Sequence, residues 1–312
     1  MTELDNKALS EVRNMEGVEY VEEDGVVLQE AVLVTEDRTF ENDVANWGLD
    51  RIDQRSNRLD GKFFINGSGN GVHVYILDSG LRPTHKDIAG RAHVAYDAYG
   101  GSGFDIDGHG THCAGIVAGT EYGVAKKANV YGIRIIRGHH KGSVSGVIRG
   151  LNWVKLNRKR PCVVSMSISG TASKTLNRSA RELFNSGCVL VAAASNSNTD
   201  SCTRSPAQMP EVITVAASDR NDFRTSFSDY GDCVDLFAPG SHILSLDYKS
   251  DDATIPLSGT SMATPFVSGA AAILLEKGYP YNEVARRLRE LSTKGVIQHK
   301  GYHTPNRLLY LD

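Results

Sequence analysis

The sequence predicts an α/β fold, a doubly wound and mostly parallel sheet with helices on both of its faces. Two observations predict it. Short continuous apolar runs, typical of strands that are buried on both faces, recur along the chain. They alternate with longer stretches whose apolar residues have helical spacing, which favours parallel strands joined by right-handed helical crossovers.

The expected elements begin after Trp47 and follow one another along the chain. The expected strands are Val72–Leu77, Val130–Ile136, Cys162–Ile168, Cys188–Ala193 and Val212–Ala217. The expected helices are His109–Ala118, Ser145–Asn157, Thr175–Ser186, Pro265–Lys277 and Asn282–Leu291. The helix at Pro265–Lys277 is apolar almost all round, so we expect it to run through the core.

The first 45 residues differ from the rest. They are acidic and contain one helix-like stretch, Asn6–Met15, and one short expected strand, Val18–Val21. Residues 30–43 follow without firm periodicity. We interpret residues 1–45 as a small appendage with a linker and residues 46–312 as one domain. A solvated N-terminal tail is an equally good interpretation of the composition alone.

Composition and charge exclude several classes of protein. The chain has 34 basic and 37 acidic residues, a net charge of −3, so we expect neither a nucleic-acid nor a membrane partner. With 40% hydrophobic and 23% charged residues it is not wholly disordered. The longest apolar stretch, around Ala270–Leu275, is too short to span a bilayer. Residues 1–30 have no apolar core, so this chain shows no secretory signal.

Three polar residues lie where such a fold usually places its ligands and catalytic groups, beyond the carboxyl ends of the strands. Asp78 ends an expected strand, His109 begins a helix among glycines, and Ser261 lies between a glycine turn and the buried helix. Each also has a plain structural interpretation: a turn aspartate, a structural histidine and an N-cap serine. A metal site at His109, His112 and Cys113 is disfavoured because no fourth ligand lies at a suitable spacing.

Taken together, these three residues suggest nucleophilic catalysis. A serine hydroxyl attacks poorly until a base removes its proton, and the base needs a third group to orient it and to stabilise its charged form. The order Asp, His, Ser along the chain is one of the known orders of this triad.

The surrounding segments resemble those of a known family. Ile76–Gly80, Gly108–Gly115 and Gly259–Pro265 look like the three active-site signatures of the subtilisin-like serine peptidases (subtilases), closest to the proteinase K branch. The likeness covers about Trp47 to Leu291. Supporting segments are Tyr122–Lys127, Phe227–Gly231 and Asp235–Gly240.

The resemblance implies a subtilisin-like fold and a secreted serine endopeptidase that forms an acyl-enzyme on Ser261. It implies that His109 is the general base and then the acid, that Asp78 orients it, and that Asn196 donates to the oxyanion. Polypeptide substrates would bind as an added strand. The residues implied in substrate binding are His140, Lys141, Gly142, Ser167, Ile168, Ser169, Gly170, Ala193, Ala194 and Ser195.

The chain departs from the family pattern at three positions. Ser195 and Ser169 stand where these enzymes usually carry glycine, and Phe266 stands where a histidine is usual. Phe266 is expected to alter packing near Ser261 without removing a catalytic group. Ser195 would narrow the pocket for the residue before the scissile bond or tilt Asn196. We expect broad specificity, with apolar or small residues preferred.

The resemblance also implies a structural Ca²⁺ ion and no organic cofactor. The implied ligands are the side chain of Asp235 and the main-chain oxygens of Pro210 and Val212. It further implies a disulfide between Cys202 and Cys233, which requires an oxidising compartment. Cys113 matches a buried free thiol of the proteinase K branch. For Cys162 and Cys188 the sequence offers no evident partners.

The appendage resembles the end of a subtilase propeptide, the inhibitor and folding aid of a zymogen. The resemblance covers residues 18–27, and the earlier part of a propeptide is missing, so we expect an N-terminally incomplete precursor. It implies a monomer that is secreted or vacuolar, is inhibited by its own propeptide and cuts itself between Val26 and Trp47.

A second function is compatible with the same residues. A subtilase scaffold that is catalytically silent, or that cuts only itself, would act as a binding or regulatory protein. Competent residues at all four catalytic positions argue against that alternative. A structural module without chemistry would leave the three motifs unexplained.

Overall fold

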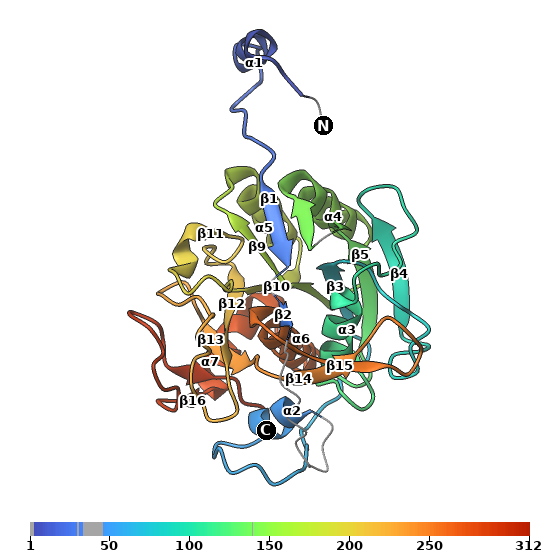
Figure 1. The fold of residues 1–312 in the computed structure, drawn as a ribbon, viewed down its shortest axis with the longest axis vertical. Coiled ribbons are helices and arrows are strands. Elements are labelled where there is room, and N and C mark those ends of the chain that lie inside the picture. The colour runs from blue at the N-terminus through green and yellow to red at the C-terminus, as the bar shows by residue number, and fades with distance from the viewer. Residues whose placement is uncertain (1–2, 30, 34–45, 139) are drawn as a thin grey trace.

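The computed structural model describes residues 3–29, 31–33, 46–138 and 140–312. Within this part of the chain, nine strands form a central sheet (Figure 1), and its seven longer strands run parallel in the spatial order β13-β12-β10-β8-β3-β5-β4. The seven are β3 (His73–Asp78), β4 (Ala92–Asp97), β5 (Asn129–Arg134), β8 (Cys162–Met166), β10 (Cys188–Ala193), β12 (Val212–Ser218) and β13 (Leu236–Pro239). Beyond β13 lie β17 (Arg307–Leu308), parallel to it, and β16 (Thr293–Lys294), antiparallel to β17.

Helices cover both faces of this sheet, as predicted. Alternate residues of β3 show why: Val74 and Ile76 pack into one core, whereas Tyr75 and Leu77 pack into the other. The first core includes residues of α3 (His109–Ala118), α6 (Thr260–Glu276) and α7 (Val284–Leu291). The second includes residues of α4 (Val144–Asn157) and α5 (Lys174–Asn185).

Two smaller sheets lie beyond the carboxyl ends of the central strands. We call the region between them, where Gln29, His109 and Leu257 line a common pocket, the cleft. One has the order β11-β9-β1-β7-β6 and the other β14-β15-β2. Their strands are β1 (Val26–Gln29), β2 (Val32–Leu33), β6 (Ile136–Gly138), β7 (Lys141–Ser143), β9 (Ile168–Thr171), β11 (Arg204–Ser205), β14 (Ile243–Leu246) and β15 (Thr254–Ser258). The remaining elements are α1 (Asn6–Arg13), α2 (Trp47–Ile52) and the 3₁₀ turns Ser201–Thr203 and Tyr281–Glu283.

Most predicted elements are found within a residue or two of their expected ends. The helix predicted from Pro265 is the main exception, because α6 begins at Thr260. Pro265 has no N–H to donate to the carbonyl oxygen of Ser261, four residues earlier. That oxygen accepts the Ser167 hydroxyl instead, at 2.9 Å, so the helix accommodates its proline.

The strand predicted at Val18–Val21 is wrong. These residues make no strand ladder, and the strand of this region is β1, five residues further on. An apolar pattern indicates an extended chain, but the partner that makes it a strand lies far away in the sequence. Here the partners of β1 are β7 and β9.

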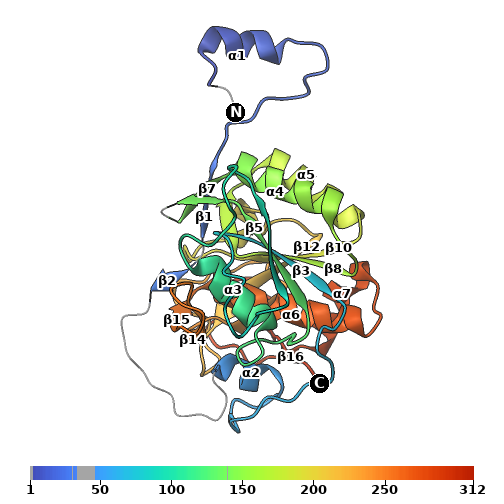
Figure 2. The ribbon, with the colours of Figure 1, turned by 90° about the vertical axis from the view of Figure 1, so that its right-hand side faces the viewer.

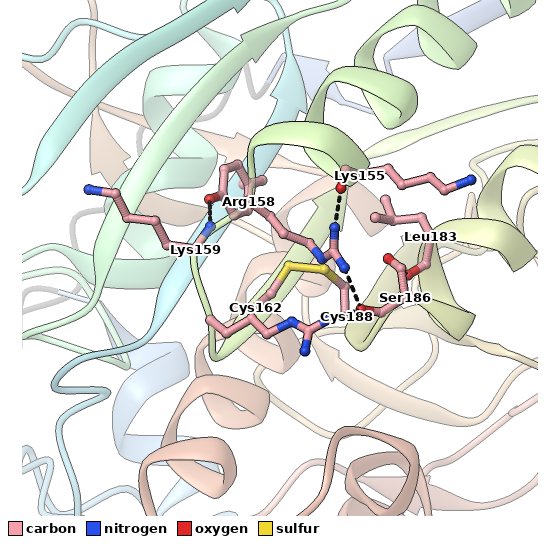
Figure 3. The surroundings of a disulfide bond; sticks show 9 residues. Lys155, Arg158, Lys159, Cys162, Leu183, Ser186 and Cys188 are labelled. Atoms are coloured by element: carbon pink, nitrogen blue, oxygen red, sulfur yellow. Dashed lines mark hydrogen bonds between the residues drawn. A yellow bond between two sulfur atoms is a disulfide. The ribbon is translucent and has the colours of Figure 1, made fainter.

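Cys162 and Cys188, for which the sequence offered no partners, form a disulfide (Figure 3) with an S–S distance of 2.03 Å. The two residues face each other at the start of the neighbouring parallel strands β8 and β10. Next to the bond, the Arg158 guanidinium donates to the carbonyl oxygens of Lys155 and Ser186. The predicted disulfide between Cys202 and Cys233 is confirmed, and Cys113 is free and buried.

Helix α1 stands away from the body of the molecule (Figures 1 and 2) and has no buried residue. Asp5 caps it by accepting the N–H groups of Lys7 and Ala8. In the described part of the chain, no helix combines the length and apolar character needed to cross a membrane.

Candidate active site

Asp78 and His109 form a buried pair at the carboxyl end of β3. Asp78 ends β3 and His109 begins α3, and their side chains are 0% and 3% exposed. The Nδ1 atom of His109 lies 2.8 and 2.9 Å from the two carboxylate oxygens of Asp78. Burial acts to lower the pKa of His109, but the charge and hydrogen bond of Asp78 outweigh it and hold that pKa well above its usual value.

The close approach of two backbones makes this pair possible. A Cβ atom on Gly110 would lie 2.2 Å from the carbonyl oxygen of Gly80. Gly80 itself has φ +124°, a conformation that side chains rarely allow. Glycine at these two positions therefore lets the start of α3 rest against the turn that follows β3.

Ser261 lies beside this pair, on the second residue of α6, and is fully buried. Its hydroxyl donates to the carbonyl oxygen of Ser167 at 3.0 Å. Among the described residues, Nε2 of His109 has no hydrogen-bond partner. The link from acid to imidazole is thus formed, whereas the hydroxyl of Ser261 donates to Ser167 and must redirect its hydrogen bond before it can reach the imidazole.

Cys113 packs between the three catalytic elements. Its Sγ atom lies 3.9 Å from Nδ1 of His109 and 3.5 Å from the carbonyl oxygen of Ser261. Burial raises the pKa of this thiol, so Cys113 is a neutral packing group at neutral pH. His112 points elsewhere: its Nε2 lies near two backbone carbonyls, and burial lowers its pKa to about 3.

Asn196 follows β10 and is oriented by the residue that precedes Ser261. Its Oδ1 atom accepts the backbone N–H of Thr260 at 3.0 Å and the Thr260 hydroxyl at 2.9 Å. Because the carbonyl end of the carboxamide is held by Thr260, the amino end is the one that can donate to a reacting oxygen. This geometry suits the predicted oxyanion donor.

The cleft in front of these residues is filled by the chain's own N-terminal segment. Strand β1 lies antiparallel between β7 and β9, so Val27 is opposite both Gly142 and Gly170. A Cβ atom on Gly170 would lie 3.1 Å from the carbonyl oxygen of Val26, so glycine there leaves room for this added strand. Val27 is 1% exposed and Leu28 is 44% exposed, as expected for alternate residues of a strand.

The residues predicted to bind substrate are thus brought together around β1. His140 precedes β7, and the other members of the two flanking segments lie in or next to the strands that pair with it. Ala193, Ala194 and Ser195 end β10 and are buried. The Ser195 hydroxyl accepts the hydroxyl of Ser169, on β9, at 3.0 Å.

Gln29 is a site residue that the sequence gave no reason to select. Its Nε2 atom donates to Asp78 at 3.1 Å, and its Oε1 atom lies 2.9 Å from Nδ1 of His140. Nδ1 of His140 also lies 3.0 Å from a carboxylate oxygen of Asp107, and burial raises the pKa of that carboxyl. Thr260 and Asp107 were missed as well, since their roles depend on neighbours that no local pattern reveals.

Two acidic residues of the segment cap helices of the domain. Both carboxylate oxygens of Asp24 accept from Ser145, at the start of α4, at 2.8 Å. Glu22 accepts the hydroxyl of Ser173 and the backbone N–H of Thr175, at the start of α5. Burial acts to raise the pKa of Glu22, but these hydrogen bonds outweigh it and lower that pKa. Carboxylates at helix N-termini stabilise the docking of the segment.

One of the predicted calcium ligands, Asp235, pairs with a cationic side chain of the protein itself. Oδ1 of Asp235 accepts Nη1 of Arg289, from α7, at 2.7 Å, and Oδ2 accepts the backbone N–H of Thr214 at 2.9 Å. Ca²⁺ requires six to eight oxygen ligands, with carboxylate charge facing the ion. Because the guanidinium already neutralises Asp235, the arrangement around this carboxylate does not fit Ca²⁺.

Comparisons with known proteins agree with this geometry. The profile of the subtilase family matches residues 69–307. An extracellular serine proteinase of Thermus sp. strain Rt41A is 44% identical, over 99% of this chain and 74% of the relative. Alkaline serine exoprotease A of Vibrio alginolyticus is 40% identical, over 98% of this chain and 57% of the relative. The crystal structure of a cold adapted subtilisin-like serine proteinase superimposes with a TM-score of 0.82 and 41% identity, over 85% of this chain and 98% of that one.

Proposed function

The chain belongs to the subtilase family and is a serine endopeptidase, and on that premise we propose that Ser261, His109 and Asp78 carry its chemistry. The buried contact between His109 and Asp78 is the observation that supports the assignment most strongly. It fixes the imidazole with Nδ1 toward the acid, so Nε2 is the atom left to exchange protons with Ser261 and the substrate.

The reaction follows from these positions. Ser261 Oγ attacks the substrate carbonyl carbon while Nε2 of His109 takes the hydroxyl proton. The C–N bond then breaks, the same proton passes to the leaving amine, and the acyl group stays on Ser261 as an ester. Water attacks the ester, giving one proton to His109 and releasing the acid, and His109 returns that proton to Ser261.

Asn196 and the backbone N–H of Ser261 stabilise the oxyanion that forms in each step. The side chain of Asn196 is held by Thr260, so it is oriented before the reaction begins. Donors that need not reorganise when charge develops are worth about 3–4 kcal/mol each in such sites.

Residues 1–45 act in this proposal as the end of a propeptide with its linker, and residues 46–312 as the peptidase domain. The position of β1 between β7 and β9 supports an inhibitor that blocks the cleft as a bound strand. Extracellular relatives support a secreted enzyme, and the proposed working form is a monomer. Subtilases generally bind structural calcium, but a site at Asp235 would require Arg289 to move away.

One observation favours the silent alternative. Because the hydroxyl of Ser261 is turned to Ser167, the catalytic link to His109 is not formed while the segment fills the cleft. In our proposal this is the latent state of a zymogen. In the alternative it is permanent, and the protein binds peptides without cutting them.

A covalent probe and a protein substrate separate these functions. We expect the matured chain to react with a fluorophosphonate and to fragment casein at neutral pH. Ser261→Ala should abolish both activities while far-UV circular dichroism stays unchanged, and the exposed control Ser56→Ala should behave as wild type. Undiminished labelling of Ser261→Ala would refute the assignment. Intact casein after removal of the segment would favour the binding protein.

A further inference from the structure

The side chain of Gln29, in β1, is buried in the cleft and is hydrogen-bonded at both ends. It is 8% exposed, whereas Leu28 is 44% exposed, so Gln29 lies on the face of β1 that points into the domain. Its Nε2 atom donates to Oδ1 of Asp78 at 3.1 Å, and its Oε1 atom lies 2.9 Å from Nδ1 of His140. A buried carboxamide is costly unless it is hydrogen-bonded, and here the domain provides a partner for each end.

The two partners of this carboxamide differ in what they offer. The carboxylate of Asp78 is fully buried and only accepts hydrogen bonds. Nδ1 of His140 also lies 3.0 Å from a carboxylate oxygen of Asp107, which likewise only accepts. Nδ1 therefore carries a proton, whether the imidazole is neutral or charged, and acts as the donor. The site around the Gln29 side chain thus presents one acceptor and one donor.

His140 contacts both the backbone and the side chain of Gln29. Its carbonyl oxygen accepts the backbone N–H of Gln29 at 3.1 Å, while its ring reaches the carboxamide. The φ angle of His140 is +60°, in the left-handed region that residues with a side chain rarely adopt. Such a conformation persists where the surroundings enforce it, most often at functional sites. The imidazole is 70% exposed, so it can be replaced without disturbing the core.

The acceptor in this site is the acid that orients the catalytic imidazole. The Oδ1 atom of Asp78 lies 2.8 Å from Nδ1 of His109 and 3.1 Å from Nε2 of Gln29. A side chain at the position of Gln29 therefore touches the proposed catalytic pair directly. A second negative charge there would be repelled by the buried carboxylate of Asp78.

We propose that this site selects glutamine at the substrate position opposite Ile168 on β9, the position that Gln29 takes in the segment. This inference rests on the proposed function. A carboxamide brings one donor and one acceptor to a site that has one of each. A glutamate side chain only accepts, a lysine side chain only donates, and a methionine side chain of similar size makes no strong hydrogen bond. The segment thus carries the side chain that the cleft prefers in its substrates.

A peptide series tests the selection in the matured enzyme. The peptides copy residues 22–33 of the chain and differ only at residue 29, which is Gln, Glu, Met or Lys. Loss of the intact peptide gives kcat/KM whichever bond is cut. We expect the Gln peptide to exceed the Glu and Met peptides by about tenfold or more, because they lose a hydrogen bond to a buried carboxylate.

Lysine at the same position separates the two partners. It can donate to Asp78 but leaves His140 without its acceptor, so we expect the Gln peptide to exceed the Lys peptide by a smaller factor, about threefold. Equal rates for all four peptides would overturn the selection. A preference for Lys would overturn it too, because the acidic groups alone would then determine this position.

Substitution of His140 assigns the preference to its donor. His140→Asp replaces the donor by an acceptor, and aspartate tolerates the left-handed backbone, so the Lys peptide should now be cut faster than the Gln peptide. His303→Asp is the matched control, since His303 is also exposed and has φ +56°, and it should keep the wild-type order. A folded His140→Asp enzyme that still prefers Gln would contradict the role of His140.

Failure of the proposed function would give a different result. No cleavage of any peptide by the wild-type matured enzyme, together with no fluorophosphonate labelling, would refute the peptidase itself. Labelling and cleavage without a preference at residue 29 would leave the peptidase in place and overturn only the selection.

Discussion

The two sides of the cleft hold the N-terminal segment unequally. Before the catalytic residues, β1 is paired on both edges, with β7 and with β9, and Val27 is buried. Beyond them, β2 is paired with β15 on one edge, and among the described residues it has no strand on its other edge. A pocket of about 530 Å³ lies between the two sides, lined by Gln29 and His140 of the first and by Ala31 and Leu257 of the second, among others.

In our proposal, this difference explains how one segment would serve as both substrate and inhibitor. A strand with two paired edges and a buried apolar side chain is bound more firmly than a strand with one paired edge. After a cut between the two sides, we expect the part before the cut to stay bound and the part after it to leave. Release of the first part, and not the cut itself, would then limit activation.

Removing an oxyanion donor should slow the self-cleavage that separates the part of the N-terminal segment on one side of the cleft from the part on the other side. In Asn196→Ala, we expect self-cleavage and casein hydrolysis to slow by about 10²–10³-fold, because the donor held by Thr260 is lost. Rates are measured by gel densitometry and dye-labelled casein. Asn152→Ala, on the exposed face of α4, is the control and should cut at the wild-type rate. If Asn196→Ala is as fast as the control, Asn196 is not the donor.

Substitutions in β1, the firmly held side of the segment, should change how tightly the segment binds to the domain more than they change catalysis. In full-length Ser261→Ala, adding Val27→Asp should reduce the amide-exchange protection of residues 26–29 by about 10²-fold, because an apolar contact is lost and a charge is buried. Leu28→Asp, on the exposed neighbour, should change protection less than about threefold. Equal effects of the two substitutions would show that burial does not distinguish the sides of β1.

The pH profile tests the chemistry alone. His109 must be neutral to accept a proton, and its pKa is raised, so kcat/KM should increase about tenfold per pH unit below a midpoint above 6.5. The same shift means that pairing with Asp78 stabilises the fold fully below the unfolded pKa, and that this contribution is lost as pH rises through the folded pKa. A midpoint at or below 6.5 in the matured enzyme would contradict the raised pKa.

The smallest expected effect is on the free energy of unfolding, and it concerns Asp235, far from both sides of the cleft. Arg289→Ala should lower the free energy of unfolding by about 1 kcal/mol, and added Ca²⁺ should restore it by taking the place of the guanidinium. The measurement is thermal unfolding in Ca²⁺ and in EGTA. Arg286→Ala, which removes only exposed ion pairs, is the control. Equal stabilisation of wild type and Arg289→Ala by Ca²⁺ would show that Arg289 does not replace the ion.

Local patterns were sufficient to predict the fold and to select the residues that we propose as catalytic. Each strand such as Val212–Ser218 carries its own apolar signal, and Asp78, His109 and Ser261 each lie in a distinctive short motif. The pairing of the sheet and the meeting of these motifs follow from general rules for parallel α/β folds.

Features that depend on distant neighbours could not be predicted. The disulfide of Cys162 and Cys188 requires knowing that β8 and β10 are adjacent and in register. Arg289 reaches Asp235 from a helix more than 50 residues later. Gln29 looks like an ordinary linker residue until β1 is placed between its partners. In each case the information lies in the tertiary arrangement and not in any window of sequence.

The disulfide at the start of β8 and β10 has a consequence at their other ends. Ser167 follows the carboxyl end of β8, and Ser195 and Asn196 follow the carboxyl end of β10. The disulfide therefore links, at their amino ends, the two strands that position these residues of the proposed active site. The bond limits how far the two strands can move relative to each other. Under reducing conditions we expect the enzyme to cut at more varied positions in its substrates at temperatures where it is still folded. The residues that follow β8 and β10 would be less well aligned with the substrate while the core remains intact.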